Sequence, residues 1–144
     1  MQPSPLLGPV VALVAWSIIM LFWMAIVRGA MARRVGIDLM ARRGGRGQDL
    51  DGKAPAEAQW PAHNYIHLME QPTLFYAITL ALVLMNFDAW INVWLAWAYV
   101  GLRVAHSIVQ ATVNIVALRF ALFFLSTLCL IGLTTHAALR LMHG

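Results

Sequence analysis

The sequence contains a single cysteine, Cys129, and few charged side chains. One cysteine excludes a disulfide within the chain, and with it a small secreted fold held together by disulfides. Charged residues make up 11% of the chain, whereas soluble domains carry about 25%. Because 61% of the residues are hydrophobic, the chain has too little polar surface to cover a soluble domain. The composition therefore predicts a membrane protein.

Long stretches lack charge altogether, and they define the predicted spans. Charged residues are absent from 1–27, 71–87, 89–102 and 120–139. A spanning helix needs about 20 mostly apolar residues, so the two shorter stretches must be extended by polar residues within the bilayer. We predict a single all-α transmembrane domain over residues 1–144. Its four helices are expected at about 6–30, 63–86, 89–112 and 114–140, with a polar loop at about 31–62.

The charges that are present indicate how the bundle is oriented. Residues 28–57 hold seven basic and four acidic side chains, whereas the connection from Asn86 to Ala89 carries Asp88 alone. Connections rich in Lys and Arg stay in the cytoplasm, so the first and third connections are predicted to be cytoplasmic and both termini outside. The formal net charge of +4 reflects this topology, and no nucleic-acid partner is predicted.

Three ionisable side chains, Glu70, Arg103 and Arg119, fall inside the predicted spans, where a charge is costly. Counted from the cytoplasmic helix ends, all three lie roughly 8–14 Å deep. One carboxylate and two guanidinium groups then share a layer, which predicts a net positive pocket. Such a pocket suits a ligand with carboxylates or a thiolate. The alternative is that Glu70 pairs with Arg103 as a contact between helices.

Helical spacing adds polar neighbours to these three residues. They are His63 and His67 in the second span, with Asn64 and Gln71 at the edge of that face, and His106, Ser107 and Gln110 in the third span. We expect the two faces to meet in the bundle interior or at a subunit interface. His63, His67 and Glu70 have a spacing that could hold a metal ion. Two nearby arginines repel a cation, so no metal site is predicted.

Two segments of the chain resemble a known family. Residues 63–76, His-Asn-Tyr-Ile-His-Leu-Met-Glu-Gln-Pro-Thr-Leu-Phe-Tyr, resemble the second helix of the MAPEG family, the membrane-associated proteins in eicosanoid and glutathione metabolism. Residues 103–107, Arg-Val-Ala-His-Ser, resemble a stretch of that family's third helix. Arg119 follows Arg103 at the spacing of a catalytic arginine in the family. The whole chain is similar to a bacterial branch, which implies a location in the bacterial inner membrane.

The resemblance implies a homotrimer of four-helix protomers with sites between protomers. It also implies a glutathione-dependent transferase or peroxidase acting on lipophilic electrophiles, with glutathione as co-substrate and lipids and lipophilic small molecules as partners. Arg119 would stabilise the glutathione thiolate, because a cation beside a thiol raises its nucleophilic fraction. The implied glutathione-binding residues are Arg103, His106, Glu70, Asn64, Gln110 and Arg28.

Three positions depart from the pattern of a catalytic member. Phe120 stands where a family enzyme has a hydroxyl residue, and Gln110 and Phe123 stand where it has tyrosines. These changes leave fewer hydroxyl donors for a thiolate. The alternative prediction is therefore a non-catalytic lipid-binding or scaffold member of the same family.

Overall fold

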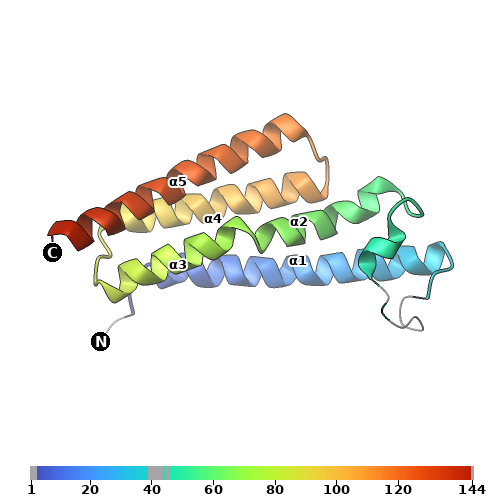
Figure 1. The fold of residues 1–144 in the computed structure, drawn as a ribbon, viewed down its shortest axis with the longest axis horizontal. Coiled ribbons are helices and arrows are strands. Elements are labelled where there is room, and N and C mark those ends of the chain that lie inside the picture. The colour runs from blue at the N-terminus through green and yellow to red at the C-terminus, as the bar shows by residue number, and fades with distance from the viewer. Residues whose placement is uncertain (1–2, 39–43, 45, 144) are drawn as a thin grey trace.

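The computed structural model describes residues 3–38, 44 and 46–143, which form a bundle of helices (Figure 1). Two short 3-10 turns, η1 and η2, lie in the connection after the first helix. The elements are α1 (Leu7–Arg34), η1 (Gly47–Leu50), η2 (Ala56–Gln59), α2 (Trp60–Leu68), α3 (Gln71–Leu84), α4 (Trp90–Ala111) and α5 (Val116–His143). The predicted all-α bundle is confirmed.

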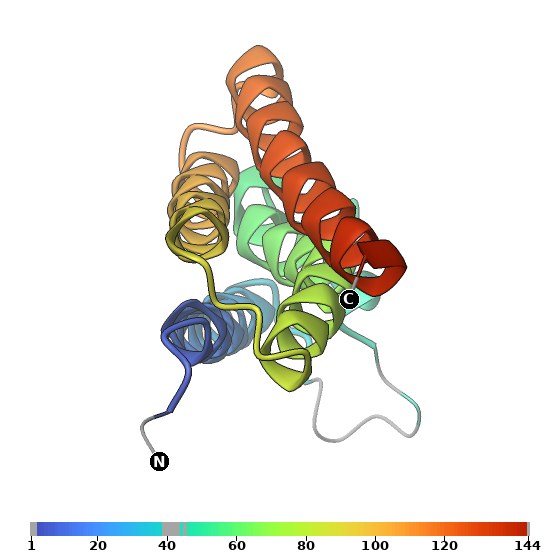
Figure 2. The same cartoon turned by 90° about the vertical axis from the view of Figure 1, so that its left-hand side faces the viewer.

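The helices run up and down in chain order, with α2 and α3 following one another as a single bent rod (Figure 1). Both termini and the α3–α4 connection lie at one end of the bundle, the termini end. The α1–α2 and α4–α5 connections lie at the other, the loop end. Viewed end-on, α1, the α2–α3 rod, α4 and α5 surround a common core (Figure 2).

Three segments are long and apolar enough to cross a membrane: Leu7–Arg34, Ala56–Leu84 and Val116–His143. The α4 helix does not meet the same hydropathy criterion, because polar side chains interrupt its apolar sequence. It packs against α1, α2 and α5. The protein is therefore an integral membrane bundle in which α4 directs polar side chains into the interior.

Left-handed turns end three of the helices. The α1 helix ends at Arg34 and is followed by Gly36, whose φ is +70°. The amide of Ile37 donates to the carbonyl of Ala32 at 2.9 Å. The turns after α3 and α4 use Asn86 and Asn114 with φ of 50° and 52°. Asparagine is one of the few residues that tolerates this conformation. The turn at Asn114 brings the chain back so that α5 packs along α4.

The second predicted span, 63–86, is interrupted at Met69 and Glu70, where the backbone leaves helical geometry. Pro72 explains the break, since it has no amide hydrogen for the carbonyl four residues earlier and its ring crowds that carbonyl. Arg103 Nη2 donates to the carbonyl of His67 at 3.1 Å. A neighbouring helix thus satisfies a backbone acceptor next to the break, as buried irregular backbone in a membrane requires.

The apolar core differs between the two ends of the bundle. Towards the termini end the core contains residues of α1, α3, α4 and α5. It includes Phe75 and Tyr99, whose rings stack with centroids 4.4 Å apart. Towards the loop end the buried apolar cluster consists of Met20, Leu68 and Ala111. Buried polar side chains, among them Asn64, Ser107 and Gln110, also lie towards the loop end, and this is where the candidate site lies.

Candidate functional site

A stripe of buried polar side chains runs the length of α4. Each of its members is less than a tenth exposed, and the spacing is the one expected for one face of a helix. The stripe consists of Asn92, Tyr99, Arg103, His106, Ser107 and Gln110. The polar face predicted for the third span is therefore directed into the bundle and away from lipid.

Arg103 is the largest fully buried side chain, with an exposure of 0%. Its Nη2 donates to the His67 carbonyl, and its Cζ lies 5.8 Å from the centroid of the Phe123 ring. Among the residues that the structure describes, Nε and Nη1 of Arg103 have no hydrogen-bond partner. Buried charged donors without partners are costly, so an anionic partner would stabilise Arg103.

Arg119 lies one turn into α5, where Nη1 donates to Oδ1 of Asn114. Its Nε is buried and has no partner in the described part of the chain. The side chain borders a cavity of about 220 Å³ near the loop end. Its other lining residues are His67, His106, Val116, Phe120 and Phe123. One small cavity therefore combines a guanidinium group, two imidazoles and an apolar wall.

His67 connects this cavity to Glu70. Its Nδ1 lies 2.8 Å from Oε2 of Glu70, and its ring centroid lies 5.1 Å from that of His106. The Glu70 side chain is 62% exposed on the protomer surface. Glu70 thus pairs with His67. The alternative contact between helices, in which Glu70 pairs with Arg103, is not formed.

The buried face of α2 is rotated from the one that the sequence suggests. His63 and Glu70 are exposed, whereas Asn64 is fully buried and donates through Nδ2 to Oγ of Ser107 on α4. Oδ1 of Asn64 has no partner within the described residues. Asn64 therefore joins α2 to α4 and keeps one free acceptor inside the bundle.

Two glutamines hold different positions near this layer. Gln71 accepts from the Tyr99 hydroxyl at 3.3 Å and donates to the Thr127 hydroxyl at 2.9 Å, so it joins α3 to α4 and α5. Gln110 is buried, and its Oε1 is unpartnered in the described structure. Gln110 does not line the cavity beside Arg119.

Arg28 lies apart from the other predicted site residues within the protomer. Its Nε donates to Oε1 of Gln59 at 3.5 Å, and its guanidinium packs so closely on Gly47 that a side chain there would collide with it. Arg28 lines a separate pocket of about 640 Å³ at the loop end of α1, with Arg33 among its other lining residues. The chain does not bring Arg28 to the Arg119 cavity.

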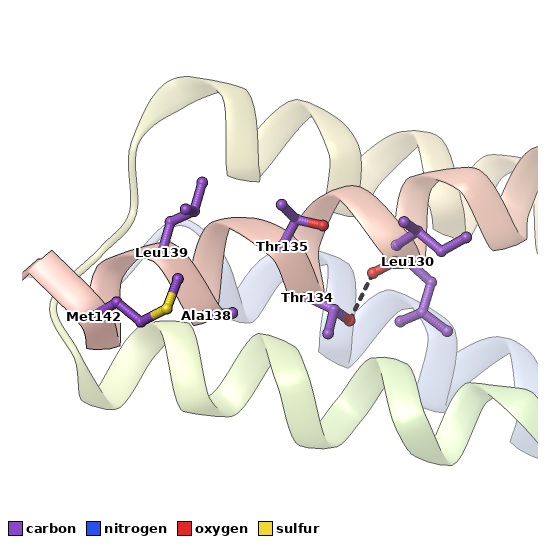
Figure 3. Close-up of a pocket in the computed structure, with 7 residues that line it drawn as sticks. Leu130, Thr134, Thr135, Ala138, Leu139 and Met142 are labelled. Atoms are coloured by element: carbon purple, nitrogen blue, oxygen red, sulfur yellow. Dashed lines mark hydrogen bonds between the residues drawn. The ribbon is translucent and has the colours of Figure 1, made fainter.

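A further groove of about 420 Å³ lies on α5 towards the termini end (Figure 3). Its wall is mostly apolar, and the hydroxyl of Thr134 is bonded to the carbonyl of Leu130 at 2.8 Å. None of the described residues that line this groove is ionisable. Although it is larger than the cavity beside Arg119, it offers no group for acid–base chemistry or anion binding.

The comparison with known families agrees with this architecture. The sequence model of the MAPEG family matches residues 6–139, which is nearly the whole chain. The chain belongs to the MAPEG family. MAPEG proteins are membrane proteins of glutathione and eicosanoid metabolism, so membership supports this general area of function. No curated protein and no solved structure matches the chain.

Sequence reasoning overlooked part of the cavity of this MAPEG protein. Phe120 and Phe123 lack the hydroxyls of a catalytic member, yet both rings form the cavity wall. Arg119 and Phe123 share a helix face, as their spacing of four residues predicts. His67 was noted but not counted as a site residue, although Glu70 three positions later predicts the observed pair.

Proposed function

We propose that the protein is a glutathione-dependent membrane transferase or peroxidase acting on lipophilic electrophiles, with Arg119 stabilising the glutathione thiolate. One observation carries the proposal. Within the described part of the chain, Arg103 and Arg119 keep guanidinium nitrogen atoms without a partner, because the carboxylate of Glu70 pairs with His67 instead. Two guanidinium groups left without a carboxylate partner favour an anionic ligand.

Other side chains supply groups that complement glutathione. The unpartnered acceptors Asn64 Oδ1 and Gln110 Oε1 suit its amide and ammonium hydrogens. Arg103 suits a carboxylate, and His106 borders the cavity and offers a further polar contact. Glutathione brings the thiol, and the chain contributes the positive charge that favours the thiolate at Arg119.

The lipid-facing side of the cavity suits an apolar second substrate. Phe120 and Val116 are each 69% exposed on the protomer surface while they also line the cavity. A lipophilic electrophile or hydroperoxide dissolved in the bilayer would meet this apolar wall before it reaches Arg119.

The open face of the cavity also supports a site between protomers of a homotrimer. A neighbouring protomer would cover the exposed carboxylate of Glu70, and its Arg28 would add a cation at the loop end. Because members of the family are generally oligomeric, we expect native mass spectrometry in detergent to give the mass of three 16.0 kDa chains.

The test combines binding and turnover on the purified protein in detergent. Glutathione binding is measured by calorimetry, and turnover is measured with an aryl halide and with a lipid hydroperoxide. Arg119→Ala is expected to bind glutathione but to lose about 100-fold in kcat, because the thiolate loses its counter-charge. Arg140→Ala, an exposed arginine at the other end of α5, is the matched control and should behave as wild type.

The outcomes separate the two functions considered. Binding without any turnover by the wild-type protein would favour the non-catalytic lipid-binding or scaffold alternative. Absence of glutathione binding, or a kcat unchanged by Arg119→Ala, would contradict the proposed function.

A further inference from the structure

We propose that His67 is the general base of this site, accepting the thiol proton of glutathione, and that Glu70 is the positioning residue that orients it. The inference rests on the function proposed above and supplies a step that this function lacks. Arginine side chains remain protonated in proteins, so neither Arg103 nor Arg119 can accept the proton that leaves the thiol. A thiolate in this cavity therefore needs a separate proton acceptor.

The geometry at the α2–α3 break points to His67. Its side chain lines the same cavity as Arg119, so both residues can reach one sulfur atom held there. Glu70 Oε2 lies 2.8 Å from Nδ1 and, as a carboxylate, accepts the Nδ1 hydrogen. This bond fixes the tautomer in which Nε2 carries the free electron pair. A histidine held at one nitrogen by a carboxylate is the arrangement that hydrolases use for a general base.

His106 is less suited to the same role, although it borders the same cavity. It is 4% exposed, and no side-chain hydrogen bond to a carboxylate orients it within the described residues. We therefore assign the proton to His67, the imidazole with an acidic partner.

Charged and titratable groups near His67 lie on α2, at the break, on α4 and on α5. These groups are Glu70 at the break, His63 one turn earlier on α2, Arg103 and His106 on α4, and Arg119 on α5. Glu70 is the one carboxylate among them. It therefore supplies the negative charge that stabilises the imidazolium after proton transfer.

The step balances without any further reactant. His67 Nε2 takes the proton, and the electron pair of the S–H bond remains on sulfur beside Arg119. In a substitution, that pair forms the bond from sulfur to the electrophilic carbon, and the leaving group departs with the pair of its own bond. The proton on His67 passes to the departing anion, so the products are a thioether and the protonated leaving group. His67 is then neutral again.

The experiment measures kcat against pH and glutathione affinity for wild type, His67→Gln and Glu70→Gln with an aryl halide. His67→Gln should lower kcat about 100-fold and abolish the decline of kcat at low pH, since that decline reports protonation of the base. Glu70→Gln should lower kcat about tenfold, because its amide oxygen still accepts from Nδ1 but carries no charge. The Kd of glutathione should change by less than about threefold in both variants, which also shows that they fold.

Other results would overturn the assignment. If His67→Gln keeps the wild-type kcat and pH profile while Arg119→Ala loses turnover, His67 is not the base, and the proposed function stands. If His67→Gln mainly weakens binding, the imidazole is a ligand contact. If the wild-type protein does not bind glutathione, the proposed function and this assignment both fail.

Discussion

Arg103 and Arg119 are held in different ways, and the difference separates their roles. Arg103 is fully enclosed and donates to a backbone carbonyl beside a helix break, whereas Arg119 borders a cavity and is held by an asparagine in a turn. Both keep unpartnered nitrogen atoms. Because Arg103 is anchored to the scaffold, we expect it to bind the ligand rather than to take part in chemistry.

This difference predicts how glutathione affects stability. A ligand that binds only the folded state stabilises it by about 2.7 kcal/mol at 100 times its Kd. Glutathione should therefore raise the Tm of wild type by several degrees. Arg103→Ala should remove this shift, because the anion loses its buried donors. Differential scanning fluorimetry in detergent checks this, with Arg140→Ala as control, and an undiminished shift in Arg103→Ala would show that Arg103 does not contact the ligand.

At the scale of the elements, polar contacts join the α2–α3 rod to α4. Asn64 bonds to Ser107 just before the break, and Gln71 bonds to Tyr99 just after it. Hydrogen bonds of this kind hold membrane helices together where the hydrophobic effect gives no preference for protein over lipid. The two contacts therefore fix the break against the helix that carries Arg103.

A double-mutant cycle on Asn64→Ala and Ser107→Ala measures one of these contacts. Interhelical hydrogen bonds in membranes contribute about 0.6 kcal/mol on average and at most about 1.7 kcal/mol. We expect a coupling free energy in this range from the unfolding free energies of the single and double variants in mixed micelles. Additive effects, with no coupling, would mean that the hydrogen bond contributes nothing to holding α2 against α4.

The elements show which parts of the fold and site can be predicted from sequence. The four-helix bundle follows from the charge-free stretches, because few structures other than helices can span a bilayer. The stripe on α4 is equally predictable, since α4 is a regular helix and its polar residues repeat with the helical period. The side of α2 that is exposed cannot be predicted in this way, because polar residues on a protomer surface and polar residues in the interior give the same sequence pattern.

The break itself also escapes sequence reasoning. Pro72 is compatible with the start of a new helix as well as with a bend in a continuous one. The hydrogen bond from Arg103 to the His67 carbonyl comes from a helix distant in sequence. No local pattern contains that contact, so neither the break nor the resulting position of His67 beside Arg119 could be derived from the second span alone.

At the scale of the whole molecule, the charge distribution and the fold define a direction across the membrane. The described parts of the basic segment, 28–38 and 46–57, lie at the loop end together with the α4–α5 turn. The cavity beside Arg119 lies near that end. If the basic segment is cytoplasmic, as the positive-inside rule predicts, the site faces the cytoplasmic leaflet. Glutathione would then enter from the cytoplasm and the lipophilic substrate from the bilayer.

Cysteine accessibility tests this orientation. With Cys129 replaced by alanine, Asp88→Cys in the α3–α4 turn should react with a membrane-impermeant maleimide on intact cells. Asp51→Cys, in the α1–α2 connection, should react only after permeabilisation. The reverse pattern would place the loop end outside and contradict the predicted topology.

The central claim, that Arg119 holds glutathione as a thiolate, is tested most directly by ultraviolet difference spectroscopy. Glutathione is titrated at neutral pH into purified wild type, Arg119→Ala and the control Arg140→Ala, and thiolate absorbance is followed together with binding. The account predicts a thiolate band with wild type and the control, and bound glutathione without this band in Arg119→Ala. Equal thiolate absorbance in wild type and Arg119→Ala, or none in wild type, would contradict it.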